Sequence, residues 1–317
     1  MSIRIALNKW IDELARDEST KRAYKRAVEF FFSINKLPDD FNTEKLTYKH
    51  YSTYLVWLRK NYGPSTQAQY STGVSRFLAH LFLNDLADVN PEKTRAAKKE
   101  LTIQEKSSLP QFPREDIETI LESTDMFLEQ LFDNEKARLR AYRDRAFLFT
   151  LADTGLRIHE TCNLRRGQID QNEGQAVVKG KGRKHAVVRF SPRSLRAIRA
   201  YLEARATLDS SSGKPLGSLP VFASHSKSSG SKVKPLTTKS GRDIIDYWVV
   251  RILGDSKKGT ITPHSFRHYF VTIVLRGTGN LKLAQELARH SSISTTERYA
   301  HLSNDELDKG YHELFPF

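Results

Sequence analysis

Apolar residues recur at helical spacing along most of this chain, and this periodicity restricts the fold more than any other feature of the sequence. In residues 1–90 we expect a short first helix over residues 4–14, followed by three apolar stripes with steps of three or four positions. The stripes run from Tyr24 to Ile34, from Tyr51 to Leu58 and from Tyr70 to Leu81. We therefore predict a four-helix domain over residues 1–90, with helix N-caps at Ser19 and Thr47 and the aromatic residues in its core.

A polar, lysine-rich stretch follows this domain. Residues 91–112 are bracketed by prolines and contain few apolar side chains to bury. We predict that they form an exposed basic linker to a second domain, residues 113–317, which has a C-terminal tail from about residue 304.

The hydrophobic period changes in the middle of the second domain. Residues 175–178 and 185–190 are short β-branched runs, and the Gly-containing segment 179–184 between them is typical of a hairpin. A further short strand is expected at residues 220–223, and a charged insertion occupies residues 129–140. The pattern is helical from residue 114 up to this insertion, and an apolar helix follows it at residues 146–151. Further helical patterns cover residues 192–206, 238–253, 263–276, 280–290 and 295–303. The predicted fold is mainly α with a small antiparallel β-sheet.

The charge of the chain indicates a polyanionic partner. Lys and Arg outnumber Asp and Glu by 51 to 37, which leaves a net charge of +14, and residues 1–90 account for only +3 of it. Such an excess is typical of nucleic-acid binding, although a generically basic protein is the alternative. The candidate phosphate contacts, for which a solvated face is the alternative, are Lys21, Arg22, Lys25, Arg26, Lys93, Arg95, Lys98, Lys99, Arg183 and Lys184.

Several function classes are excluded by what the sequence lacks. Cys162 is the single cysteine, which rules out a disulfide framework and a multi-cysteine zinc site. No run of 18 uncharged apolar residues could span a membrane, and the first residues do not resemble a secretory signal. There is neither a phosphate-binding Gly-rich Lys-Ser/Thr loop nor a carboxylate cluster for Mg²⁺. We expect a cytosolic protein without a metal or cofactor.

Four places in the second domain hold polar residues that a core does not need. They are Arg157 in Thr-Gly-Leu-Arg with Glu160 one turn later, Lys181 between two glycines, the His264-x-x-Arg267 pair, and His290 nine residues before Tyr299. Thr262 and Pro263 predict a helix start that puts His264 and Arg267 one turn apart, near the partial positive charge of a helix N-terminus. Ser294 and Glu297 predict a capping box for the helix that carries Tyr299. Taken singly, each residue has an ordinary structural explanation.

The order Arg157, Lys181, His264-x-x-Arg267, His290, Tyr299 resembles the catalytic set of the tyrosine recombinases, the phage integrase family. The resemblance covers about residues 114–303. Residues 1–90 are similar only in length and pattern to the helical, SAM-like core-binding domain of that family. The chain has Ala288-Arg289 where the family usually has Leu-Gly, so that either the turn differs or Arg289 reaches the DNA.

The resemblance implies a site-specific recombinase that acts without ATP or metal. Tyr299 would form a covalent 3′-phosphotyrosyl link, while Arg157, Arg267 and His290 hold the non-bridging phosphate oxygens. His264 and Lys181 would move the protons, although the sequence does not fix which acts as acid or base. Glu160 is expected to be a structural partner that orients the site.

The resemblance also implies an assembly on duplex DNA with specific recombination sites. Four protomers would act on two sites through a Holliday junction, from a monomer or weak dimer off DNA, in association with the nucleoid. We expect the tail, with its apolar residues between Leu307 and Phe315, to dock on a neighbouring protomer. A mobile-element enzyme for integration, excision or transposition is the expectation. The alternatives are a housekeeping dimer resolvase, a type IB topoisomerase and a catalytically silent DNA-binding protein.

Overall fold

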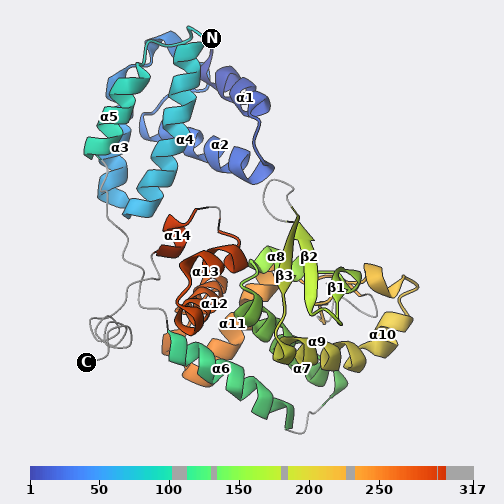
Figure 1. Cartoon of the computed structure of the whole chain (residues 1–317). Coiled ribbons are helices and arrows are strands. Elements are labelled where there is room, and N and C mark those ends of the chain that lie inside the picture. The colour runs from blue at the N-terminus through green and yellow to red at the C-terminus, as the bar shows by residue number, and fades with distance from the viewer. Residues whose placement is uncertain (102–112, 130–133, 180–184, 226–232, 291, 298–317) are drawn as a thin grey trace, which may run out of the picture. The chain divides into compact units, whose positions relative to one another are not determined.

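The computed structural model describes residues 1–101, 113–129, 134–179, 185–225, 233–290 and 292–297 (Figure 1). The chain divides into two compact units, Met1–Ser107 and Ser108–Phe317, which are treated separately below. The predicted class, mainly α with a small antiparallel sheet, is confirmed. In the described ranges no helix is long and apolar enough to cross a membrane.

The N-terminal unit is helical, as its apolar periodicity predicts. Its helices are α1 (Ile3–Glu13), α2 (Glu18–Ile34), α3 (Tyr48–Asn61), α4 (Pro64–Leu83) and α5 (Pro91–Leu101). Tyr51, Tyr54 and Phe77 are fully buried, which confirms that the aromatic residues form the core. Helices α2 and α4 approach closely at Gly73, where an added Cβ would lie 2.9 Å from the Cβ of Ala27.

The two predicted N-caps have different outcomes. Thr47 is the N-cap of α3, as expected. Helix α2 begins after Asp17 rather than Ser19, because the Asp17 carboxylate accepts the backbone N–H of Thr20 at 2.9 Å. Ser19 lies inside the first turn and donates its hydroxyl to Asp17. Hydrogen bonds from the Ser19 hydroxyl, the Thr20 N–H and the Thr20 hydroxyl hold the pKa of Asp17 well below its usual range.

The prediction of an exposed linker over residues 91–112 is wrong for its first half. Residues 91–101 form α5, which packs against α3 and α4. Thr94 and Ala97 are buried, and Leu101 contacts the core of the unit. Two small residues and one leucine are enough to give this lysine-rich helix an inner face, which its low overall hydrophobicity conceals. Residues 102–112 lie outside the described part of the chain.

The C-terminal unit combines a three-stranded antiparallel sheet with helices (Figure 1), and Val177 and Val187 of the sheet are exposed. The strands β1 (Ile169–Asp170), β2 (Gln175–Lys179) and β3 (His185–Arg189) are adjacent in chain order, with Val177 opposite Val187. The predicted hairpin is therefore confirmed, and β1 is an addition. The helices are α6 (Arg114–Met126), α7 (Glu135–Thr154), α8 (Ile158–Asn163), α9 (Pro192–Ala204), α10 (Ala206–Ser210), α11 (Thr238–Leu253), α12 (Pro263–Thr278), α13 (Leu281–Ala288) and α14 (Ser294–Glu297).

Three local predictions in this unit need correction. Residues 220–223 make only isolated bridges, although Val221 and Phe222 are buried in the core. The charged insertion is helical from Glu135, because the Asn134 side chain caps α7 through the N–H of Ala137 at 2.8 Å. Helix α14 includes Ser294 as its first residue rather than following it as a cap.

Helix α7 lies at the centre of this unit and leads the chain to the candidate site. It packs against α9 and α12, and residues 146–152 are buried without interruption. It ends at Gly155, whose φ of +58° is a conformation that glycine adopts without strain. A Cβ at Gly155 would lie only 2.4 Å from Cδ1 of Phe270 on α12. This glycine therefore allows the end of α7 to meet α12.

Candidate active site

Arg157 is held at the start of α8 by a residue one turn later. It is the N-cap of that helix, and its backbone N–H donates to Oε2 of Glu160 at 2.9 Å. Its guanidinium Nη1 lies 3.4 Å from Glu160 Oε1. The side chain of Glu160 is 2% exposed and that of Arg157 is 36% exposed. Glu160 thus fixes the backbone of Arg157 while the guanidinium keeps access to solvent.

Arg267 connects three segments that are distant in sequence. It lies on α12, is buried, and donates Nη1 to the carbonyl of Gly155 and Nη2 to the carbonyl of Ala288. Gly155 precedes Arg157 by two residues, and Ala288 precedes His290 by two. The one guanidinium therefore draws the ends of α7 and α13 to α12.

His290 follows α13 and faces the short helix α14. Its Nδ1 lies 2.9 Å from Oγ1 of Thr296, which is fully buried. Burial, together with the nearby cations Arg267 and Arg157, lowers the pKa of His290 to about 4. The imidazole is therefore neutral at neutral pH and can donate one hydrogen bond. Sequence reasoning missed Thr296, and the only signal was its place in the Thr-Thr pair ahead of Tyr299.

His264 lies in the first turn of α12, as predicted. Thr262 is the N-cap and accepts the N–H of Ser265, and Pro263 is the first helical residue. The His264 side chain is exposed, whereas Arg267 one turn later is buried. The N-terminal end of this helix contributes partial positive charge beside the two side chains.

Residues 124–306, more than half of the chain, match the model of the phage integrase family. The chain belongs to this family. A tyrosine recombinase XerC from Pelobacter propionicus is 30% identical over 299 residues, which cover 94% of this chain and 89% of that protein. The tyrosine recombinase XerC of Pediococcus pentosaceus is 31% identical over 76% of this chain and 72% of its own length. This recombinase is accordingly an enzyme of DNA strand cleavage and rejoining.

Solved structures of recombinases share its fold. The Tn1549 transposon integrase in complex with transposon right end DNA has a TM-score of 0.69 and 16% identity, with 100% of both chains covered. The XerH site-specific recombinase bound to its difH substrate has a TM-score of 0.63 and 18% identity, covering 92% of this chain and 78% of that one.

Four of the predicted site residues, two of them catalytic candidates, lie outside the described part of the recombinase. Lys181 belongs to the segment between β2 and β3, together with Arg183 and Lys184, and Tyr299 follows α14 by two residues. The structure thus brings Arg157, Arg267 and His290 together. His264 lies at the N-terminal end of α12, as Arg267 does. Lys181 and Tyr299 stay predictions.

The Arg289 side chain, a predicted DNA-contact candidate, lies against Glu160. Its side chain is 12% exposed and its Nη2 lies 3.0 Å from Oε2 of Glu160. The turn itself keeps the left-handed conformation that is typical of glycine, because Arg289 adopts φ 56° and ψ 45° as the C-cap of α13. Burial lowers the pKa of Arg289, against the effect of Glu160.

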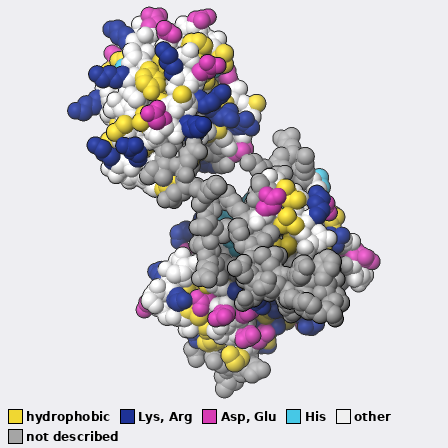
Figure 2. Space-filling model, turned by 60° about the vertical axis from the view of Figure 1, so that its left-hand side comes forward, with side chains coloured by type: hydrophobic (Ala, Val, Ile, Leu, Met, Phe, Trp, Pro, Cys, Tyr) yellow, Lys and Arg dark blue, Asp and Glu magenta, His cyan; other side chains and the backbone are white. Residues whose placement is uncertain are grey.

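The basic candidates of the N-terminal unit differ in exposure. Figure 2 shows Lys and Arg side chains over this unit. On α2, Arg22 and Arg26 are exposed, whereas Lys21 and Lys25 are partly buried. On α5, Lys93, Arg95 and Lys99 are exposed. Lys98 is partly buried and donates to Oγ1 of Thr72 at 2.7 Å, and burial, with Arg76 nearby, lowers its pKa.

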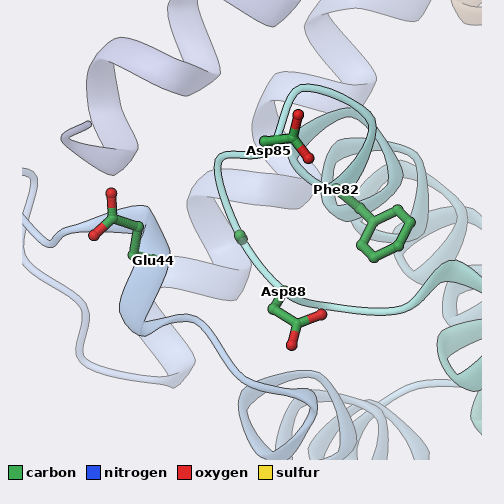
Figure 3. A pocket seen from close by; sticks show the side chains of 5 residues that line it. Glu44, Phe82, Asp85 and Asp88 are labelled. Atoms are coloured by element: carbon green, nitrogen blue, oxygen red, sulfur yellow. The ribbon is translucent and has the colours of Figure 1, made fainter.

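A pocket in the N-terminal unit does not belong to this site. Glu44, Phe82, Asp85 and Asp88 line it, and Figure 3 shows their side chains, three of which are carboxylates. Three carboxylates repel a phosphate, so the pocket is unsuited to DNA. Across the described residues no group of three or more His, Cys, Asp or Glu could hold a metal ion.

Proposed function

We propose that this recombinase cuts and rejoins duplex DNA at specific sites through a covalent 3′-phosphotyrosyl link on Tyr299. The observation that carries the proposal is the pair of hydrogen bonds from Arg267 to the carbonyls of Gly155 and Ala288. These bonds gather the segments of Arg157 and His290 around a second guanidinium. Two guanidinium groups and a neutral imidazole suit a phosphodiester whose non-bridging oxygens gain charge.

Each polar group then has a distinct part in the first strand cleavage. Arg157 and Arg267 bind the non-bridging oxygens, and His290 donates a further hydrogen bond. When the Thr296 hydroxyl donates to Nδ1, the other ring nitrogen of His290 carries the proton that it donates. This arrangement stabilises the transition state more than the ground state, which is the requirement for a faster reaction.

The proton and bond changes balance without a cofactor. The Tyr299 oxygen forms a bond to phosphorus and the P–O5′ bond breaks. The Tyr299 proton goes to His264, and Lys181 supplies a proton to the departing 5′ oxygen. One phosphodiester is exchanged for another, so that the reverse sequence with a new 5′ hydroxyl rejoins the DNA.

The partner in this proposal is duplex DNA, contacted by both units. The basic side chains of α2 and α5 supply phosphate contacts from the N-terminal unit. The DNA complexes named for the XerH and Tn1549 relatives support this partner class. A tetramer on two sites, strand exchange through a Holliday junction, and docking of the tail from about residue 304 are parts of the same proposal. The tail lies outside the described residues.

The biological role in this proposal is housekeeping resolution rather than transfer of a mobile element. Relatives at 30–31% identity carry the name XerC, which favours the resolvase alternative over the mobile-element expectation. The likeness to the Tn1549 integrase is at 16% identity and does not favour the mobile-element role over the housekeeping role.

Covalent trapping tests the proposed reaction. Purified protein and its Tyr299→Phe variant are incubated with labelled duplexes from the flanks of its own gene and with random duplexes, without metal, and analysed on denaturing gels. The expected result is a protein–DNA adduct that the variant does not form. Salt-sensitive binding with no adduct on any duplex would favour the catalytically silent alternative, and adducts on every duplex would favour a topoisomerase.

A further inference from the structure

Arg289 combines two unfavourable features beside the candidate active site. Its φ of 56° is a left-handed conformation that side chains other than glycine rarely adopt. Its Nε and Nη1 are buried and have no hydrogen-bond acceptor among the described residues. Strained backbone and unsatisfied donors at one residue are typical of sites under functional constraint.

The backbone of Arg289 helps to place its neighbour His290. The left-handed turn lets the N–H of His290 donate to the carbonyl of Gln285 at 3.0 Å, and Gln285 returns a side-chain hydrogen bond to the His290 carbonyl at 3.2 Å. A glycine would form this turn with less strain. The turn therefore does not explain why an arginine occupies the position.

The Arg289 side chain shares one carboxylate with Arg157. Glu160 Oε2 lies 3.0 Å from Nη2 of Arg289, whereas Oε1 lies 3.4 Å from Nη1 of Arg157. The ion pair of Glu160 with Arg289 is therefore shorter than its ion pair with Arg157. Because Glu160 is buried, its carboxylate needs a cationic partner in either case.

The division of this carboxylate matters for a phosphate-binding site. A carboxylate that is paired closely with a guanidinium weakens the net electrostatic attraction between that guanidinium and a phosphate. Without Arg289, Glu160 would attract the Arg157 guanidinium more strongly, away from the exposed position that it has in this structure.

We propose that Arg289 is a positioning residue for Arg157: it engages the Glu160 carboxylate and so keeps the Arg157 guanidinium available to the scissile phosphate. The proposal rests on the proposed function of the site. It differs from a direct contact between Arg289 and DNA, because it acts through Glu160 and therefore depends on the charge at residue 160.

The test compares four proteins on the duplex that covalent trapping identifies: the wild type, Arg289→Gln, Arg289→Lys, and the double variant Glu160→Gln/Arg289→Gln. Single-turnover cleavage is measured at a temperature where circular dichroism shows every protein to be folded. We expect Arg289→Gln to be at least tenfold slower and Arg289→Lys to stay within threefold of the wild type. The double variant should be at least threefold faster than Arg289→Gln, since it removes the carboxylate that captures Arg157.

The rate of the double variant relative to Arg289→Gln distinguishes a positioning role of Arg289 from a direct phosphate contact and from a purely structural role. A direct phosphate contact or a purely structural role predicts a double variant as slow as Arg289→Gln or slower, and that result would overturn the proposal. Cleavage by Arg289→Gln within twofold of the wild type would also overturn it. Loss of the wild-type adduct on every duplex would instead overturn the proposed function, and this inference with it.

Discussion

The Arg267 guanidinium donates a hydrogen bond to the carbonyl of Gly155, 112 positions earlier in the chain. The same side chain donates to Ala288, so that a candidate phosphate ligand is also a structural tie between α7, α12 and α13. Two functions in one side chain predict that its loss will affect both stability and reaction.

Arg267→Gln should lower the rate of adduct formation by on the order of 10²–10³, because a preorganised donor to the transition state is lost. It should also lower the free energy of unfolding by about 1–3 kcal/mol, since buried carbonyls lose their donors. Cleavage assays and urea denaturation measure the two effects. The matched control is Arg276→Gln, an exposed arginine of the same helix, which should change neither.

Gly155→Ala should destabilise the C-terminal unit by about 1–3 kcal/mol. The added Cβ would meet the Phe270 ring, and φ +58° is unfavourable for alanine. Thermal unfolding followed by circular dichroism provides the measurement. Gly213→Ala, at φ +67° with nothing within 4 Å, isolates the backbone contribution, and an equal loss there would contradict the steric explanation.

Acidification should destabilise the protein partly through His290. Its pKa is about 4 in the folded chain against an ordinary value of 6.5, so that the unfolded state takes up a proton before the folded state does. The free energy of unfolding should therefore fall as the pH drops from about 6.5 towards 4. His290→Asn should flatten this dependence, as measured by urea unfolding at several pH values.

Part of that pH dependence should survive in the His290→Asn variant. Burial, with Arg143 and Arg205 nearby, also lowers the pKa of His225, to about 3, and its ring contacts the Tyr201 hydroxyl at 2.8 Å. If the free energy of unfolding of His290→Asn fell as steeply between pH 6.5 and 4 as that of the wild type, burial would not be what keeps His290 neutral.

Ala97→Asp should unfold or strongly destabilise the N-terminal unit, by about 3 kcal/mol or more, because it buries a carboxylate in the core. Ala96→Asp is the matched control, since Ala96 is exposed on the same helix. Thermal unfolding distinguishes the two. Equal stability of both variants would restore the view that residues 91–101 are an exposed linker.

Charge removal on α2 should weaken DNA binding in a salt-dependent way. Arg22→Gln/Arg26→Gln should reduce the slope of log K against log salt by about 1.8 if both arginines contact phosphates. Fluorescence anisotropy at several salt concentrations gives the slope. Arg59→Gln, an exposed arginine on α3, is the comparison, and an unchanged slope in the double variant would assign α2 a solvated face.

Local features of the fold were predictable from the sequence, because they depend on neighbours within one turn or one hairpin. The apolar spacing predicted the helices of the N-terminal unit, and Thr262-Pro263 predicted the start of α12. The β-branched runs predicted the β2–β3 hairpin. The low density of apolar residues in the stretch 91–101 concealed α5, since its stability depends on a few small residues that fit α3 and α4.

The sequence by itself determined which chemical groups this protein has: guanidinium groups, imidazoles and a tyrosine in the order of a known family. Only the tertiary structure decided how they are held. The Arg267 bonds to Gly155 and Ala288 and the burial of Arg289 against Glu160 join separate segments of the chain. The contact of His290 with Thr296, only six positions later, holds the imidazole against α14. A pattern of residue types carries no information about which guanidinium is paired and which is exposed, because pairing depends on burial and on distances that arise only when the helices pack.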